Sequence, residues 1–323
     1  MMKSFHLYRH VAAVAVVGAA LLAGCKPDLG TPPSLIVGPR VLAVRGTPPE
    51  AKQGGDPVTY DMLVVDVDGR ATAPTIGWAV CKEPHPPAES NIVNSECLQI
   101  PDDTTGESFT GPIPSDACTN FGPLPSMPGA RPADPDVTGG YYQPVRAVWH
   151  ADSGDETAFA LERVFCSIGS IAPTEVSGKY ATDYTPNTNP AIASVVLDPG
   201  GMNVTLYEAG QATPPPPASV PAGQFITFQV NWADDAAESF LVYDITTHEL
   251  VTEREAMRLS WFTTGGILEH DRTGRSEIEV ETETFTLNLW TAPTTPGLVH
   301  LWFVLRDSRG GVDFAEAQID VTP

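Results

Sequence analysis

Residues 225–232 read Phe-Ile-Thr-Phe-Gln-Val-Asn-Trp, and this stretch decides the fold class. Apolar residues occupy every second position from Ile226 to Trp232, and polar residues fill the positions between them. Successive side chains of a β-strand point to opposite faces, so strict alternation indicates a strand with one buried face. The stretch therefore predicts part of a sheet that packs on a core.

Stretches of similar character recur on both sides of this one, separated by turns rich in Gly, Pro and Asp. They cover residues 40–45, 58–66, 75–81, 141–149, 157–166, 191–197, 257–261, 285–289, 298–306 and 315–321. The chain holds 32 prolines, and this number disfavours long helices because proline breaks them. We predict an all-β protein with two antiparallel Ig-like β-sandwich domains, residues 40–170 and 191–323, joined by a polar linker over 171–190.

Lys82–Thr138 interrupts the strand pattern of the first predicted domain. It is rich in Pro, Asp and Gly, and no regular strand pattern runs through it. The cysteines that follow Cys25 all lie in this half of the chain; they are Cys81, Cys97, Cys118 and Cys166. In an exported chain, four cysteines predict two disulfides with three alternative connectivities. We favour Cys81–Cys97 with Cys118–Cys166, because the first pair closes a short local loop. The segment is then an ordered loop and the expected binding surface.

The first 24 residues have the pattern of a secretion signal. Lys3 and Arg9 precede an uncharged run of Ala, Val, Leu and Gly over 11–23, and small residues precede Cys25. The apolar run is too short for a permanent membrane helix, which needs about 20 residues. We predict cleavage between Gly24 and Cys25.

Leu22-Ala23-Gly24-Cys25 resembles the lipobox of bacterial lipoproteins. The resemblance implies diacylglycerol on the Cys25 thiol and a fatty acyl chain, such as palmitate, on the new amino group. Each buried methylene contributes about 0.8 kcal/mol, so two or three chains anchor stably. Residues 25–39 would then form the tether, and the membrane would be a partner through the lipid.

Three further stretches extend the resemblance, and they are 38–44, 137–144 and 304–312. Together with the lipobox they resemble predicted surface lipoproteins of myxobacteria, and the closing hairpin resembles those of Ig-like and PKD-type modules. The resemblance implies a cell-envelope location, at the outer membrane with a periplasmic or surface-facing body. It implies no reaction.

The net charge restricts the partners. Removing residues 1–24 takes away two basic residues and no acidic one, which leaves 16 basic and 40 acidic residues and a formal charge of −24. Such a surface repels nucleic acid, so a role in DNA or RNA binding is excluded. The charge also keeps an exported protein soluble.

Motifs of the common enzyme classes are absent from the sequence. It contains no G-x-S-x-G, H-E-x-x-H, P-loop or dinucleotide-binding fingerprint. The histidines that follow the signal are widely spaced, and they are His85, His150, His248, His270 and His300. Because none lies three to five residues from another, we predict no metal site, and we place His300 on the outer face of a strand.

Several patterns have both a functional and a structural interpretation, and we favour the structural one for each. Asp66-Val-Asp68-Gly69 and 307–313 could bind calcium but are typical Asp-Gly turns. Tyr141, Tyr142 and Trp149 could stack on a sugar but are more typical of a core. Pro214–Pro217 could be a docking motif but predicts a stiff loop.

A ladder of glutamates precedes a change in the alternation of apolar residues. Glu277, Glu279, Glu281 and Glu283 share one face of a strand, and apolar residues take over that parity from Phe285. We therefore expect a bulge or turn near 282–284 and a solvated glutamate face.

These observations favour a lipid-anchored envelope protein with a non-enzymatic binding, adhesion or structural role. Its ligand would be a protein or a polysaccharide, and the sequence predicts no cofactor beyond the lipid. Two alternatives stay open: a carbohydrate-binding module at the cell surface, and a hydrolase whose catalytic residues are dispersed in the sequence.

Overall fold

The structure is a computed structural model that describes residues 30–84, 93–122, 140–151, 154–198, 200–276 and 283–323. The predicted signal peptide, the cleavage site and Cys25 lie outside the described residues, and so do His85 and Glu277, Glu279 and Glu281. Residues 33–323 form one compact unit. Among the described residues, no helix has the length and apolar character that a membrane span requires.

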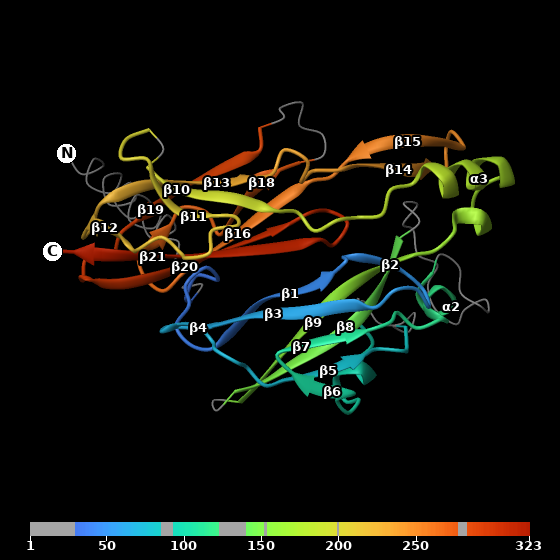
Figure 1. Cartoon of the computed structure of the whole chain (residues 1–323), viewed down its shortest axis with the longest axis horizontal. Helices are drawn as coiled ribbons and strands as arrows, with labels where there is room; N and C mark the ends of the chain where they lie inside the picture. Colours follow the sequence, from blue (N-terminus) through green and yellow to red (C-terminus); the bar gives the residue numbers. More distant parts are fainter. Residues whose placement is uncertain (1–29, 85–92, 123–139, 152–153, 199, 277–282) are drawn as a thin grey trace, which may run out of the picture. The chain divides into compact units, whose positions relative to one another are not determined.

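The strands of the amino-terminal half are β1 (Arg40–Thr47), β2 (Glu50–Lys52), β3 (Val58–Asp66), β4 (Gly69–Arg70), β5 (Ile76–Val80), β6 (Thr104–Gly106), β7 (Ser108–Gly111), β8 (Gly140–Ala151) and β9 (Gly154–Phe165). They form two sheets (Figure 1). Sheet A has the order β2-β9-β8-β5-β6, and sheet B has the order β1-β3-β4 with β7 paired to β3. A 3-10 helix, η1 (Ser95–Leu98), and a helix, α2 (Ala117–Phe121), lie between β5 and β8.

The strands of the carboxyl-terminal half are β10 (Ile192–Leu197), β11 (Val204–Glu208), β12 (Ala218–Pro221), β13 (Phe225–Trp232), β14 (Ser239–Asp244), β15 (Glu249–Arg254), β16 (Met257–Thr263), β17 (Ile267–Leu268), β18 (Arg272–Arg275), β19 (Phe285–Thr291), β20 (Gly297–Arg306) and β21 (Val312–Thr322). Sheet C has the order β12-β21-β20-β16-β18, and sheet D has the order β11-β10-β13-β19-β17. Strands β14 and β15 form a separate hairpin.

Each half buries a core between its two sheets. In the first half, Tyr60 and Met62 of sheet B pack with Trp78 and Val145 of sheet A. In the second half, alternate residues of β13 point inward as the sequence predicts, and Phe228 lies among the rings of Trp261, Trp290 and Phe303. The predicted all-β class is therefore confirmed.

A third apolar layer lies between sheets B and C. Leu63 and Val65 alternate with the core residues of β3, and they pack with Trp302 and Val304 on the face of β20 that points away from the core of the second half. Both sheets are thus buried on two faces, which sets the layer order A-B-C-D. The almost continuous apolar run over 298–305 carries this signal, because alternation with polar residues fails in strands that are buried on both faces.

A buried ionic cluster at Arg309 adds polar contacts between the halves. The guanidinium group is almost fully buried and donates to Glu255 Oε1 (2.5 Å) and Glu238 Oε2 (2.6 Å), while Glu50 Oε2 of the first half lies 3.7 Å away. Arg309 also donates to the hydroxyl of Tyr184, which donates to Glu50. One cluster thus joins β2, the segment after residue 183, and the turn after β20.

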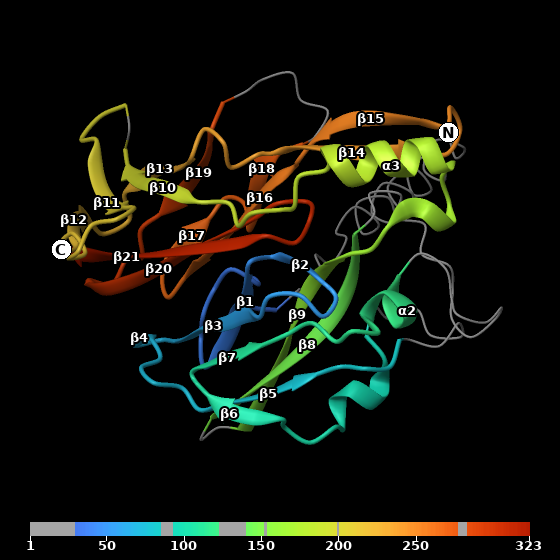
Figure 2. The same cartoon turned by 45° about the vertical axis from the view of Figure 1, so that its right-hand side comes forward.

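Two expectations for the connecting segments need correction. Lys82–Thr138 contains η1, β6, β7 and α2, so its described part is not an irregular loop; β6 pairs with β5 and β7 pairs with β3, which extends both sheets of the first half. The predicted linker contains a helix, α3 (Thr174–Asp183), beside η2 (Ile168–Ser170) (Figure 2). Tyr180 of α3 stacks on Phe165, which is an apolar contact that the polar composition conceals.

Two strand pairs depart from the predicted antiparallel pattern. Strands β2 and β9 pair in parallel, and so do β12 and β21. Both short strands, β2 and β12, lie at the edge of a sheet and were not predicted as strands. The division into two domains stays a prediction.

Candidate functional site

His300 lies on the face of β20 that points toward the first half of the chain. Its ring is parallel to that of Trp302, with 5.9 Å between the ring centroids and 12° between the planes. On its other side the ring approaches Gly69, where a Cβ atom would lie only 3.0 Å from His300 Cε1. Gly69 also has a φ of +122°, so close approach and backbone conformation both require glycine there. The outer face predicted for His300 is therefore the face of sheet C that packs against sheet B. We call this contact between sheets B and C the seam.

A groove opens beside this ring, and we call it the His300 groove. Its volume is about 700 Å³, which falls within the roughly 300–1,000 Å³ of small-ligand sites. Its lining comes from both halves of the chain: Asp61, Met62, Asp68, Gly69, Arg70, Ala71, Thr72, Ala73, Pro74, Glu107, Ser108, His300, Glu316 and Gln318. Sheets B and C thus form its sides.

The groove carries a negative charge. Four carboxylates line it against the one guanidinium of Arg70. Burial lowers the pKa of His300 below its ordinary value, although Glu316 and Asp68 act in the opposite direction. The imidazole is therefore neutral near pH 7, and the carboxylates dominate the electrostatics of the lining.

The proline tract borders a second hollow that shares lining residues with the first. Pro214–Pro217 line a space of about 360 Å³ together with Leu206, Trp302 and Ala317. His300, Glu316 and Gln318 line both spaces. The tract predicted as a stiff loop thus forms an apolar wall of the hollow next to the His300 groove.

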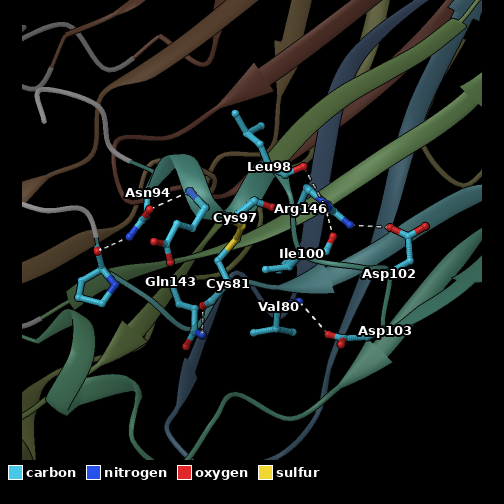
Figure 3. Close-up of a disulfide and its surroundings, with 12 residues drawn as sticks. Val80, Cys81, Asn94, Cys97, Leu98, Ile100, Asp102, Asp103, Gln143 and Arg146 are labelled. Atoms are coloured by element: carbon cyan, nitrogen blue, oxygen red, sulfur yellow. Dashed lines mark hydrogen bonds and ion pairs between the residues drawn. A yellow bond between two sulfur atoms is a disulfide. The ribbon is translucent and has the colours of Figure 1, made fainter.

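We call Lys82–Thr138 the stapled segment, because two disulfides hold it. It contributes Glu107 and Ser108 to the lining of the His300 groove. Arg146 of β8 holds its backbone in place. Arg146 is buried and donates to three carbonyl groups of the segment, those of Cys97, Leu98 and Ile100, at 2.5–3.3 Å (Figure 3). It also forms an ion pair with Asp102 (2.5 Å). Carbonyl groups that accept from a buried guanidinium hold an irregular backbone in one conformation, because each alternative conformation would leave buried polar atoms without partners.

Two disulfides complete this attachment. The structure pairs Cys81 with Cys97 and Cys118 with Cys166, with Cα–Cα distances of 5.5 and 5.6 Å. This is the connectivity that the sequence favours. The first disulfide joins the end of β5 to η1, and the second joins α2 to the end of β9. Gln143 also donates to the carbonyl group of Cys81 (2.8 Å) (Figure 3).

A smaller hollow adjoins the first disulfide. It measures about 310 Å³ and is lined by Val80, Cys81, Lys82, Glu83, Glu96, Cys97, Ile100, Pro101 and Asp103. Leu98 projects from the same turn with 56% of its surface exposed. This hollow and the Glu107 side of the His300 groove are two recessed places along the described part of the stapled segment.

The aromatic residues considered for sugar stacking are not available for it. Tyr141 is fully buried, and Trp149 is 9% exposed within the same core. Tyr142 is partly buried and its hydroxyl accepts from Arg163 (3.1 Å). A carbohydrate role would thus need another surface.

The other candidate residues belong to separate places. His150 contacts Asp155 (2.9 Å) and Asp102 (3.5 Å), whereas His248 contacts the hydroxyl of Tyr243. Asp307 is buried and accepts from the backbone N–H groups of its own turn. Within the described ranges, no group of three or more His, Cys, Asp or Glu residues has a geometry that could hold a metal ion.

The His300 groove could not be found from sequence patterns alone. Its residues come from segments between 61 and 318, and neither the alternation of a strand nor a motif links them. The available signal in the sequence is that apolar residues point to both faces of the strand over 298–305. This pattern indicates that something covers the outer face of β20. The pattern does not say what covers it.

Comparisons with known proteins identify no family. No protein-family model matches the chain, and no curated protein matches its sequence. Among solved structures, the D0-D1 domain of Intimin is 14% identical, covers 87% of this chain and 99% of its own, and has a TM-score of 0.23. The adhesin InvE of Yersinia pseudotuberculosis is 8% identical, covers 88% of this chain and 59% of its own, and has a TM-score of 0.22. Scores this low give no ground for transferring a role.

Proposed function

We propose that this chain is a lipid-anchored envelope protein that binds a partner without catalysing a reaction, and that the partner occupies the His300 groove. The lipobox supports the anchor. The groove supports the binding role, because it is open to solvent and lies against the buried apolar contact between sheets B and C.

The single observation that carries this proposal is the charge of the lining. Asp61, Asp68, Glu107 and Glu316 face the groove, and Asp61 already pairs with Arg45 (3.0 Å). The remaining carboxylates favour a cationic ligand, and a chain of formal charge −22 also attracts cationic partners over a distance. We therefore propose a basic peptide segment of another envelope protein as the ligand.

Replacing groove carboxylates by amides tests the proposal. The protein would be the chain from residue 25 with Cys25→Ser, and the probe a fluorescent lysine-rich peptide. Because an exposed ion pair contributes about 0.2–1 kcal/mol, Glu107→Gln with Glu316→Gln should weaken binding about fivefold. The affinity would be measured by fluorescence anisotropy at low and moderate salt.

The matched control removes the same charge from a distant hairpin. Glu249→Gln with Glu253→Gln changes two exposed residues of β15, and peptide affinity should stay unchanged. Equal weakening by both pairs would mean that only the net charge of the protein matters for binding. This result would contradict the proposal that the peptide binds in the His300 groove. Binding of a neutral polysaccharide that depends on Glu107 would instead support the carbohydrate alternative.

A further inference from the structure

Four loops gather at one end of the second half, and we call this the loop end. They are residues 198 and 200–203, 221–224, 264–266 and 292–297, each following or preceding a strand of sheet C or D. Backbone hydrogen bonds join two of them: Gly223 donates to Pro293 (3.2 Å) and Ala292 donates to Gln224 (2.9 Å). Ala222 donates to Thr322, so the last strand ends here as well (Figure 1).

The loop end is almost free of charge, in contrast to the rest of the chain. Its four loops contain one charged residue, Asp198. The loops at the other end of the same strands differ, since 233–238 holds three acidic residues and 307–311 holds Asp307 and Arg309. In a strongly acidic protein, such a local absence of charge marks a surface that meets something other than bulk water.

Large apolar side chains project from this end. The exposed fractions are 69% for Phe225, 71% for Ile267, 51% for Met202 and 51% for Leu298. Phe225 and Ile267 both lie opposite Thr291 in the register of sheet D, so they share one face of the sheet on the two strands that flank β19. Scattered exposed apolar residues are normal, but a group at one end of two packed sheets indicates an interaction surface.

The start of the compact unit is attached beside this surface. Ile36 donates to the carbonyl group of Thr263 (2.9 Å), and Thr263 donates to that of Ser34 (2.9 Å). Thr263 directly precedes the 264–266 loop, and the neighbouring Val37 is 68% exposed. Seven residues separate Cys25 from Pro33, and at 3.3–3.6 Å per residue they reach about 25 Å at most.

We propose that the loop end lies on the membrane, with Phe225, Ile267, Met202 and Leu298 inserted among the headgroups of a zwitterionic phospholipid bilayer. This inference rests on the proposed lipid anchor, which would bring the uncharged end within reach of the lipid. The acidic remainder of the surface would be repelled by anionic headgroups. The bilayer contact would hold the body in one orientation and point the charged ends of the strands away from the lipid.

Fluorescence quenching by brominated phosphatidylcholine tests the contact in the lipidated protein. The tryptophans of the chain are buried, so a new exposed tryptophan reports on its own surroundings. In vesicles of this lipid, the added emission of a Phe225→Trp variant should be strongly quenched. Ile245→Trp, on the β14–β15 hairpin, provides the matched control and should show no added quenching.

A second measurement uses the chain from residue 25 with Cys25→Ser and phosphatidylcholine vesicles. Because burial of each large apolar side chain contributes roughly 1.5–3 kcal/mol when complete, Phe225→Ser with Ile267→Ser should lower the partition coefficient about tenfold. Ile245→Ser with Val251→Ser replaces two apolar side chains of the β14–β15 hairpin that are 61% and 36% exposed, and it should change nothing.

The outcomes separate this inference from the proposed anchor. Equal effects of both serine pairs, or no quenching at position 225 in lipidated protein, would overturn the membrane contact and leave the anchor intact. An unmodified amino terminus found by mass spectrometry would instead refute the anchor, and the partition of unlipidated protein would still test the lipid affinity of the loop end.

Discussion

At the scale of single residues, Arg309 is the polar centre of the seam. Its guanidinium group is buried between Glu255 and Glu238, with Glu50 of the first half close by. A buried ion pair adds little net stability when complete, but removal of one partner leaves charges without compensation. The cluster therefore makes the relative position of its elements specific.

Arg309→Ala should destabilise the protein by about 3–5 kcal/mol, because it leaves Glu255 buried without its cation, whereas Glu50 keeps Arg163 at 3.4 Å. Urea denaturation followed by tryptophan fluorescence would measure the change. Arg258→Ala, at an exposed position of β16, is the control and should have little effect. A small effect of Arg309→Ala would show that water enters the seam readily.

Stability should also fall as the pH rises through neutrality. Burial and the Asp307 carboxylate raise the pKa of Glu255 to about 7, against the lowering effect of Arg309. Because the pKa of Glu255 is higher in the folded than in the unfolded state, protonation of Glu255 stabilises the folded protein. This stabilisation is complete below the unfolded pKa, about 4.3, and is lost as the pH passes 7. Burial likewise raises the pKa of Glu162 and Asp307. Denaturation midpoints between pH 5 and pH 8 should decrease, and Glu255→Gln should flatten the slope.

At the scale of elements, the stapled segment shows what sequence patterns could and could not predict. Strands with one buried face, such as β13, follow from alternation because burial repeats every second residue. Strands β6 and β7 are too short for a pattern, and they form because Arg146 and the disulfides place this backbone at free sheet edges. The charge on Arg146 gave no hint that its side chain is buried.

The stability lost on removal of each disulfide should increase with the length of chain that the disulfide closes. Cys118 and Cys166 are 48 residues apart and Cys81 and Cys97 are 16 apart. On a chain-entropy estimate, replacing Cys118 and Cys166 by alanine should cost about 4 kcal/mol, and replacing Cys81 and Cys97 about 3 kcal/mol. Chemical denaturation of both double variants gives the order, and the reverse order would show that native contacts outweigh the entropy of the unfolded chain.

At the scale of the whole molecule, the seam between sheets B and C joins the two predicted domains. Trp302, Val304 and Val312 would be exposed if the halves separated. We therefore expect one cooperative unfolding transition by calorimetry for the chain from residue 25 with Cys25→Ser. Two transitions would instead support independent domains. The fragment 191–323 alone should aggregate, since it would present this apolar face to water.

Under the proposed function, the location of the whole molecule depends on the Cys25 thiol. Cys25→Ser should release the protein from the membrane fraction, because the acyl chains supply the anchoring energy. Fractionation with immunoblotting and metabolic labelling with palmitate would measure it. A serine variant that stays membrane-bound and labelled would show that the lipid is attached elsewhere.

The pairing of Leu35 with Thr263 has a mechanical consequence. Residues 34–36 run parallel to the end of β16, so tension applied from the amino terminus would load their two hydrogen bonds in shear, and both must rupture together. A pull between an anchored terminus and a bound partner would pass first into the central sheet C and only then into β1. The protein would thus resist traction at its most deeply packed layer, and its first strand would be shielded from peeling.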